Sequence, residues 1–262
     1  MNNKVTPNFP TELHEQAVLA ARDFFLQQQH VDTVLLVNSL ARGKATPESD
    51  IDMVVLVLEN SSPAQIKTLE GGWQDFLKTE PILIKYKDSS SSAQIQLDII
   101  DGVFKPAPFE EGGPIDFLEV EIGNRIVYSA PLTDEGEYFK KLKLQWLPYY
   151  DGTLQTERFK MAKDACIYDL DHIPYFVKRG LYFHAFDRLY KAFQEFLQAL
   201  FISNKTYPIA YNKWIKEQIV DILKLPELYK ELPRILSVSN IESEELNEKV
   251  KALRILLEKY CK

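Results

Sequence analysis

The spacing of apolar positions changes along the chain and predicts two parts of different architecture. In the first part, apolar runs of strand length alternate with patterns of helical period. Strands are expected at 34–38, 51–58, 82–87, 94–100 and within 120–129, and helices at about 11–25 and 63–78. The serine-rich stretch 88–92 is expected to join two of these strands as a hairpin. The first part is therefore predicted to be a sheet with antiparallel strands, flanked by helices.

From Asp134 onward the strand pattern is absent. Apolar and aromatic residues recur at helical spacing from Leu181 to Phe201, which predicts one long amphipathic helix. Further helices are expected at 138–149, 153–170, 211–224 and 243–260. Because Pro131 interrupts the chain, we predict a domain over 1–130 and an all-α bundle over 131–262. The fold class is thus α+β, followed by a helical bundle.

A polar loop from Asn38 to Ser49 leads into two acidic residues, Asp50 and Asp52. Residues i and i+2 of a strand point to the same side, so these carboxylates are expected to project together while Ile51, Met53 and Val55 face the core. Two like charges held this close repel each other unless a cation lies between them or one is protonated. Magnesium prefers such oxygen ligands together with substrate phosphates. The segment is therefore predicted to bind a metal–nucleotide complex.

The sequence of this segment contains Asn-Ser-Leu-Ala-Arg-Gly and then Ser-Asp-Ile-Asp. It resembles the signature of the polymerase-β-like nucleotidyltransferase superfamily. That signature is Gly-Ser, a short spacer, and Asp-x-Asp at the start of a strand. Asn38 stands where the family has glycine. Asparagine is the non-glycine residue that best tolerates a left-handed backbone, so we expect the turn to be kept. The resemblance implies a nucleoside triphosphate substrate and two Mg²⁺ ions.

The resemblance also implies a third carboxylate from a neighbouring strand. Asp98 and Asp101 are the candidates. Strand parity places Asp98 on the polar face and Asp101 with the apolar set, so we predict Asp98 as the third metal ligand and as the acceptor of the nucleophile's proton. The alternative role for Asp101 is a turn residue before Gly102.

The resemblance gives further roles in phosphate binding. Ser39 and the backbone amides that start at Asn38 are expected to hold the β- and γ-phosphates at a helix start. Arg42 is expected either to steady this loop or to form a structural ion pair.

The second part has a looser resemblance of its own. The run Leu200–Pro208, followed by Tyr211–Ile215, resembles the helical domain of antibiotic nucleotidyltransferases that act on aminoglycosides or lincosamides. The resemblance implies that Lys205 and Lys213 bind the triphosphate; the alternative is that both are ordinary surface lysines. Tyr207 and Trp214 are expected either to line the binding cleft or to pack in the core.

Charge and composition narrow the range of partners. The net charge is −7, and the chain has no long Lys/Arg block. Because phosphate contacts dominate nucleic-acid affinity, this balance argues against a nucleic-acid partner and for a small-molecule or protein acceptor. Cys166 and Cys261 lack metal-ligand spacing and are expected to be reduced thiols. No signal peptide or membrane-spanning stretch is found, so a cytoplasmic protein is predicted, with no membrane partner.

Together these features predict an enzyme that transfers AMP from ATP to a hydroxyl of a small molecule, aminoglycoside- or lincosamide-like. The alternatives are a protein AMP-transferase of antitoxin type and a non-catalytic, nucleotide-binding regulator. The Arg-x₄-His spacing of Arg179 and His184 also resembles ribonucleases of the HEPN type. The acceptor, the base of the nucleotide and the oligomeric state stay open, with a homodimer among the options.

Overall fold

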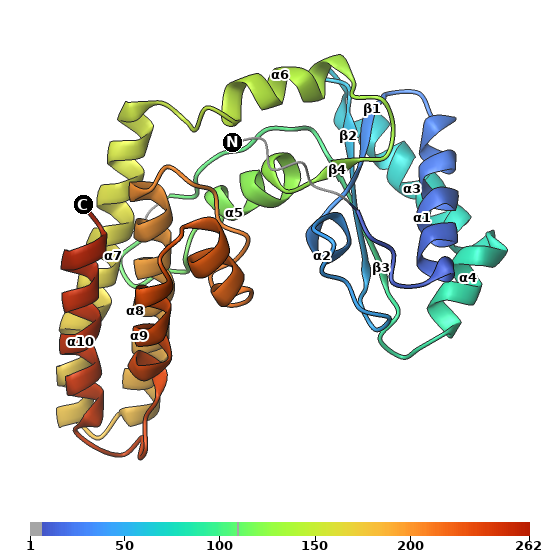
Figure 1. Cartoon of the computed structure of the whole chain (residues 1–262). Coiled ribbons are helices and arrows are strands. Elements are labelled where there is room, and N and C mark those ends of the chain that lie inside the picture. The colour runs from blue at the N-terminus through green and yellow to red at the C-terminus, as the bar shows by residue number, and fades with distance from the viewer. Residues whose placement is uncertain (1–6, 109) are drawn as a thin grey trace. The chain divides into compact units, whose positions relative to one another are not determined.

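The computed structural model describes residues 7–108 and 110–262 (Figure 1). The chain forms two compact units, which are described separately. The first comprises the residues up to Phe104 together with Ile122–Pro148, and the second comprises Lys105–Glu121 together with Tyr149–Lys262. This division differs from the predicted boundary at residue 130: the segment 105–121 packs with the later helices, and the stretch up to Pro148 packs with the sheet.

The first unit is built on a four-stranded mixed sheet with strand order β3-β2-β1-β4. Its strands are β1 (Val31–Leu36), β2 (Ile51–Val57), β3 (Ile95–Ile100) and the two-residue β4 (Ala130–Pro131). β1 pairs antiparallel with β2 and with β4, whereas β2 pairs parallel with β3. A parallel pair needs a crossover connection, which α3 (Pro63–Thr79) and α4 (Pro81–Asp88) supply.

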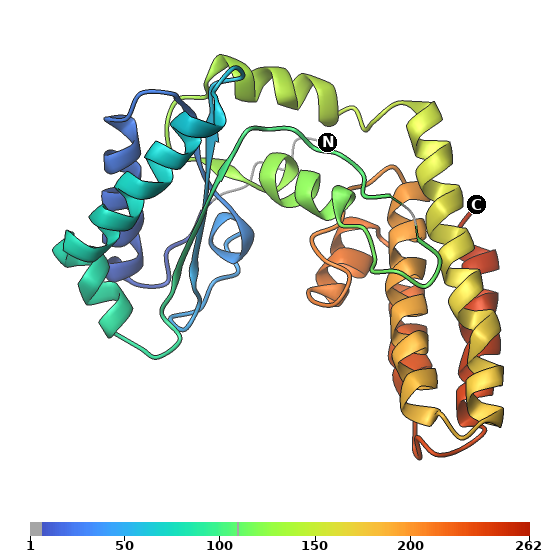
Figure 2. The same ribbon diagram turned by 180° about the vertical axis from the view of Figure 1, so that it is seen from behind.

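Helices α1 (Glu12–Leu26), α3 and α4 cover one face of this sheet (Figures 1 and 2). The core beneath them contains the alternate residues of β2 that were predicted to face inward, Ile51, Met53 and Val55. The Thr11 side chain caps α1, and Ser62 and Gln65 form a capping box at α3. The predicted helix starts in this unit are thus confirmed.

Two predicted strands of the first unit are wrong. Residues 82–87 form α4, because Pro81 at the first turn and a Glu80 cap start a helix that buries Leu83 and Tyr86 three residues apart. The serine run therefore leads from a helix into β3, and no hairpin is formed. Residues 120–129 form the end of α5 (Leu118–Ile122) and the π-helix η1 (Gly123–Val127). The strand that closes the sheet is β4, where Ala130 pairs with Leu36.

After α6 (Glu137–Trp146) of the first unit, the remaining helices belong to the second unit. They are α7 (Gly152–Lys178), α8 (Tyr182–Ser203), the π-helix η2 (Glu217–Ile222), α9 (Pro226–Leu236) and α10 (Glu245–Tyr260). α7, α8 and α10 lie side by side around a continuous apolar core (Figures 1 and 2). The long helix predicted from the aromatic spacing is confirmed as α8, while α9 was not predicted. No helix in the described part of the chain is long and apolar enough to cross a membrane.

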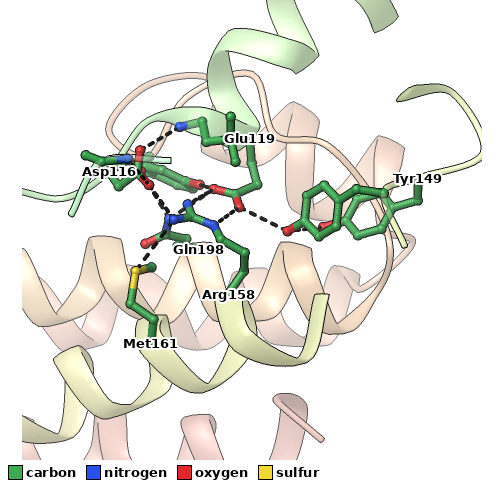
Figure 3. A network of polar contacts seen from close by, with 10 residues as sticks. Asp116, Glu119, Tyr149, Arg158, Met161 and Gln198 are labelled. Carbon is green, nitrogen blue, oxygen red and sulfur yellow. Dashed lines mark hydrogen bonds and ion pairs between the residues drawn. The ribbon is translucent and has the colours of Figure 1, made fainter. Parts of the chain in front are cut away.

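A buried ionic network fixes the segment 105–121 within the second unit (Figure 3). Arg158 of α7 donates two hydrogen bonds of 2.8 Å to the carboxylate of Glu119, and both side chains are almost fully buried. Arg158 also pairs with Asp116, and Gln198 of α8 donates to Glu119 at 3.0 Å. Buried charges need this degree of pairing, so the network explains why the segment belongs with the helices.

Candidate active site

The turn after β1 has the backbone conformation that the sequence predicts. Asn38 has a φ of +56°, and it starts the short helix α2 (Asn38–Ala41). Glycine is the usual residue for this left-handed conformation, and asparagine adopts it at the lowest cost among the other residues. The substitution of asparagine for the family's glycine is therefore compatible with the turn.

The same turn lies beside the two acidic residues. The amide of Val37 donates to the carbonyl of Asp52 at 3.1 Å, one step beyond the antiparallel pair Leu36–Met53. Because the two strands run in opposite directions, Asn38 and the residues after it continue alongside the start of β2. The polar loop and the carboxylate pair are thus brought together by strand register.

Asp50 and Asp52 flank a fully buried residue, Ile51, and both carboxylate residues are partly exposed. This is the predicted parity, with the acidic side chains away from the core. The amide of Gln94 donates to Oδ1 of Asp50 at 3.3 Å. That contact holds one of the two carboxylates at the entrance to β3.

Two side chains that the sequence analysis did not identify anchor the residue before Asp50. The carbonyl of Ser49 accepts hydrogen bonds from the hydroxyl of Tyr86 at 2.9 Å and from Nε2 of His14 at 3.0 Å. Both partners are buried, and their rings meet edge to face with centroids 5.0 Å apart. His14 lies in a helical apolar pattern and Tyr86 in an apolar stretch predicted as a strand, so only the structure reveals this role.

Tyr86 also reports the electrostatics of the site. Burial, followed by the negative charges of Asp50 and Asp52, raises the pKa of Tyr86 to about 12. The phenol therefore stays protonated at neutral pH and remains a hydrogen-bond donor. Because both carboxylates act on the same hydroxyl, their negative charge is concentrated at the start of β2.

Asp98 lies on the predicted face of β3. In the parallel register Asp52 pairs with Gln96 and Val54 pairs with Asp98. Asp98 therefore lies two residues after the partner of Asp52, on the same face of the sheet. Its side chain is 65% exposed, and its carboxylate lies 3.4 Å from the guanidinium of Arg125 in η1. The nearest cation to Asp98 is thus supplied by the protein itself.

Asp101 has the role of a turn residue. Its carboxylate accepts from the amide of Val103 at 2.9 Å, and its carbonyl accepts from the hydroxyl of Tyr138 at 2.9 Å. The following Gly102 has a φ of +74°, and a Cβ there would lie 2.9 Å from both Leu142 and Tyr138. The turn therefore requires glycine, and the parity argument that favoured Asp98 over Asp101 agrees with this arrangement.

Asp50 and Asp52 offer carboxylate oxygens on the same side of a strand, which suits hard divalent cations. In the described part of the chain, no group of three or more His, Cys, Asp or Glu side chains is arranged to hold a metal. Asp98, the predicted third ligand, is paired with Arg125.

Two cavities border the first unit at different places. One of about 250 Å³ is lined by Ile99, Asp101 and Arg125, close to the exposed face of β3. Another of about 510 Å³ is lined by His30 and Leu58, at the end of β2 remote from Asp50. Neither of these two cavities is lined by Asp50, Asp52 or Asp98.

The remaining predicted residues lie in both units. Ser39 and Arg42 are half-buried at the turn of the first unit. Lys205 and Lys213 are exposed in the second unit, Lys205 just after the C-terminus of α8. Tyr207 is buried and packs against Tyr149, with ring centroids 4.7 Å apart, so its role is core packing.

The Arg-x₄-His pair lies at the turn between α7 and α8. Arg179 and His184 are both exposed, and the ring of His184 packs edge-on against Phe176 with centroids 4.3 Å apart. None of the cavities described in either unit is lined by these two side chains.

Comparison with known proteins agrees with the geometry of the turn and the carboxylates. Residues 20–120 match the nucleotidyltransferase domain family, a range that contains β1, α2, β2 and β3. No curated protein and no solved structure matches the chain significantly. By this match the protein is a transferase of the nucleotidyl-transferring class.

Proposed function

We propose that the protein transfers a nucleoside monophosphate, AMP from ATP, to a hydroxyl of a small molecule that resembles an aminoglycoside or a lincosamide. The observation that carries this proposal is the hydrogen bond from the Val37 amide to the Asp52 carbonyl, which sets the Asn38 turn beside two carboxylates. A phosphate-binding turn and a pair of hard oxygen ligands are the two parts that nucleotidyl transfer needs side by side.

The turn binds the triphosphate in this proposal. The first amides of a helix have no partner within the helix and attract anions, and Ser39 adds a hydroxyl at the same place. Arg42, which follows α2 directly, holds the loop in position. The β- and γ-phosphates then lie at the turn, and the α-phosphate lies toward Asp50 and Asp52.

Asp50 and Asp52 would hold two Mg²⁺ ions, and Asp98 would complete the ligands of the ion near the nucleophile. When bound, the ions would draw negative charge from the attacking and leaving oxygens. The acceptor's oxygen attacks the α-phosphorus in line, and the bond from that phosphorus to the bridging oxygen breaks, so pyrophosphate leaves with its electron pair. Asp98 accepts the proton of the hydroxyl through Oδ1, since its ion pair with Arg125 uses Oδ2.

The charge of the chain favours a small acceptor. With a net charge of −7 and no long basic block, the protein attracts cationic molecules and repels polyanions. An acceptor that carries both amines and hydroxyls suits this field, which is the reason for preferring the aminoglycoside-like class. Binding of the triphosphate by Lys205 and Lys213 remains part of the proposal.

The test combines labelled ATP, CTP, GTP or UTP with Mg²⁺ and a panel of aminoglycosides and lincosamides. We expect pyrophosphate release with ATP and a mass increase of one AMP on one acceptor. Labelling of a protein acceptor would replace the small-molecule proposal by a protein AMP-transferase. Nucleotide binding without any pyrophosphate release would identify a regulator, for which Asn38 and the Asp98–Arg125 pair are the supporting features.

A further inference from the structure

Four charged side chains form a compact cluster inside the second unit, far along the sequence from the carboxylates of β2. Asp169 of α7 is fully buried and lies 2.6 Å from the guanidinium of Arg188 and 3.4 Å from the ammonium of Lys191, both on α8. Lys191 also lies 3.8 Å from the carboxylate of Glu195, which is 4% exposed. Two buried carboxylates thus share two cations.

The two carboxylates cannot both be charged without cost. Burial, and then the charge of Asp169, raise the pKa of Glu195 to about 8, against the opposing effect of Lys191 and Arg188. Oε2 of Glu195 and Oδ2 of Asp169 are both buried without a hydrogen-bond donor in the described part of the chain, so a protonated Glu195 can donate to Asp169 and an ionised one cannot. The cluster then carries one net positive charge.

Other ionisable groups near Glu195 do not change this balance. Cys166 of α7 lies close enough to interact with Glu195, and burial raises the pKa of its thiol, so it is neutral. On α10, the guanidinium of Arg254 is paired with Asp171 at 2.6 Å, and Cys261 is a buried thiol whose pKa is raised to about 12 by burial.

The cationic side of the cluster opens onto a cavity of about 300 Å³. Arg188 and Lys191 line one wall together with the exposed Asp187, whose charge offsets part of theirs, and Gly112, Gly113 and Pro114 line another. Gly112 has a φ of +69°, and a Cβ there would lie 2.9 Å from Nη1 of Arg188. Glycine therefore permits the loop to approach the guanidinium, whose Nη1 also donates to the Gly112 carbonyl at 3.4 Å.

The guanidinium has donors left for a ligand. The hydrogen bonds of Arg188 within the described part of the chain all use Nη1, so Nε and Nη2 remain available. Among the described residues, the ammonium of Lys191 makes long ion pairs, at 3.4 and 3.8 Å. A planar guanidinium beside an ammonium is the arrangement that binds phosphate or sulfate groups.

We propose that this cavity binds an oxyanion, a phosphate or sulfate group, through Arg188 and Lys191, and that binding requires a protonated Glu195. A bound anion competes with the carboxylates for the two cations. Its affinity is therefore higher when Asp169 alone is ionised than when Asp169 and Glu195 are both ionised. This site is independent of the proposed nucleotidyl transfer, because it uses no residue of the first unit.

The test measures sulfate binding to the full chain by titration calorimetry at pH 6.5 and pH 9, at constant ionic strength kept with sodium chloride. Sulfate has the same charge at both pH values, so any change in affinity belongs to the protein. Because about a tenth of Glu195 stays protonated at pH 9, we expect sulfate to bind about tenfold more weakly there. No detectable sulfate binding at pH 6.5 would overturn the proposal.

Three variants make the assignment specific. Lys191→Gln should weaken sulfate binding about tenfold at both pH values. Glu195→Gln, which is permanently neutral and isosteric, should bind sulfate equally at both. The control Lys230→Gln removes an exposed lysine that pairs with Glu227 and should behave like the wild type. Equal affinities of the Lys191 and Lys230 variants, or an unchanged pH dependence in Glu195→Gln, would refute the site.

A competition arm identifies the source of the oxyanion. ATP without magnesium is added to the sulfate-bound protein and to the variant Asp50→Asn with Asp52→Asn, whose nucleotidyl-transfer site is disabled. Displacement of sulfate in both proteins supports a phosphate group carried by a nucleotide. Sulfate retained at saturating ATP supports a free inorganic oxyanion at the same site.

Discussion

The hydroxyl of Tyr86 donates to the carbonyl of Ser49 at 2.9 Å, the last peptide unit before the carboxylate pair. Through this bond a buried side chain of α4 holds the position of Asp50, although it touches neither carboxylate by a hydrogen bond of its own. With a pKa raised to about 12, by burial first and then by Asp50 and Asp52, the phenol keeps its proton throughout the physiological pH range.

Replacement of this hydroxyl should therefore affect the site more than the fold. We expect Tyr86→Phe to lower the free energy of unfolding by about 1 kcal/mol, the usual value of one hydrogen bond, and to reduce kcat severalfold. The matched control is Tyr138→Phe, which loses a 2.9 Å bond to the Asp101 carbonyl in the same unit. Steady-state kinetics and urea unfolding of both variants measure the difference. An equal loss of kcat in the two would argue against a positioning role for Tyr86.

The double variant Asp50→Asn with Asp52→Asn tests the metal-binding role. It should abolish magnesium-dependent pyrophosphate release while the melting temperature stays the same or rises, because the variant removes the repulsion between two like charges. The control Asp75→Asn changes an exposed aspartate of α3 that pairs with the exposed Lys78, and it should retain activity. Pyrophosphate release that persists in the double variant would end the proposed mechanism.

Arg125 should compete with the metal for Asp98. Their ion pair is 3.4 Å long and the Asp98 side chain is 65% exposed, so the pair contributes little to stability. We expect Arg125→Gln to bind Mn²⁺ severalfold more tightly, as measured by electron paramagnetic resonance of the free ion, and Arg125→Lys to resemble the wild type. Weaker Mn²⁺ binding by Arg125→Gln would show that the guanidinium supports the site.

The sequence was sufficient for the carboxylate pair because strand parity is local: Asp50 and Asp52 follow from alternation around the buried Ile51. It failed where local patterns are ambiguous. The apolar residues at 82–87 fit both periods, and the choice depended on Pro81 and the Glu80 cap. Partners distant in sequence gave no signal at all, since Tyr86 meets Ser49 only when the crossover returns to the sheet.

The same limitation applies to the network around Glu119 (Figure 3), in which hydrogen-bonded residues are up to 92 positions apart in the chain. Glu119 is fully buried, so Arg158→Met would leave an unpaired buried carboxylate. We expect a loss of about 3–5 kcal/mol in the free energy of unfolding, with partial recovery in Arg158→Met with Glu119→Gln. The control Arg234→Met removes an exposed i,i+3 pair with Glu231 and should change stability little. Chemical denaturation of the wild type, the two single variants and the double variant measures the loss and the recovery. If the double variant shows no recovery, the guanidinium has a further essential partner.

Glu195 should make the stability of the protein depend on pH. Its pKa rises from the ordinary 4.5 to about 8, through burial first and the charge of Asp169 second, so the folded chain binds a proton that the unfolded chain has already released. Between these two values the folded state holds more protons than the unfolded state, and stability therefore falls as the pH increases from about 4.5 to about 8. Glu195→Gln should flatten this decline and be more stable than the wild type by a few kcal/mol at pH 9. Urea unfolding from pH 5 to pH 9, with the exposed Glu227→Gln as control, measures the slope. A parallel decline in the Glu195 and Glu227 variants would assign the pH dependence to other groups.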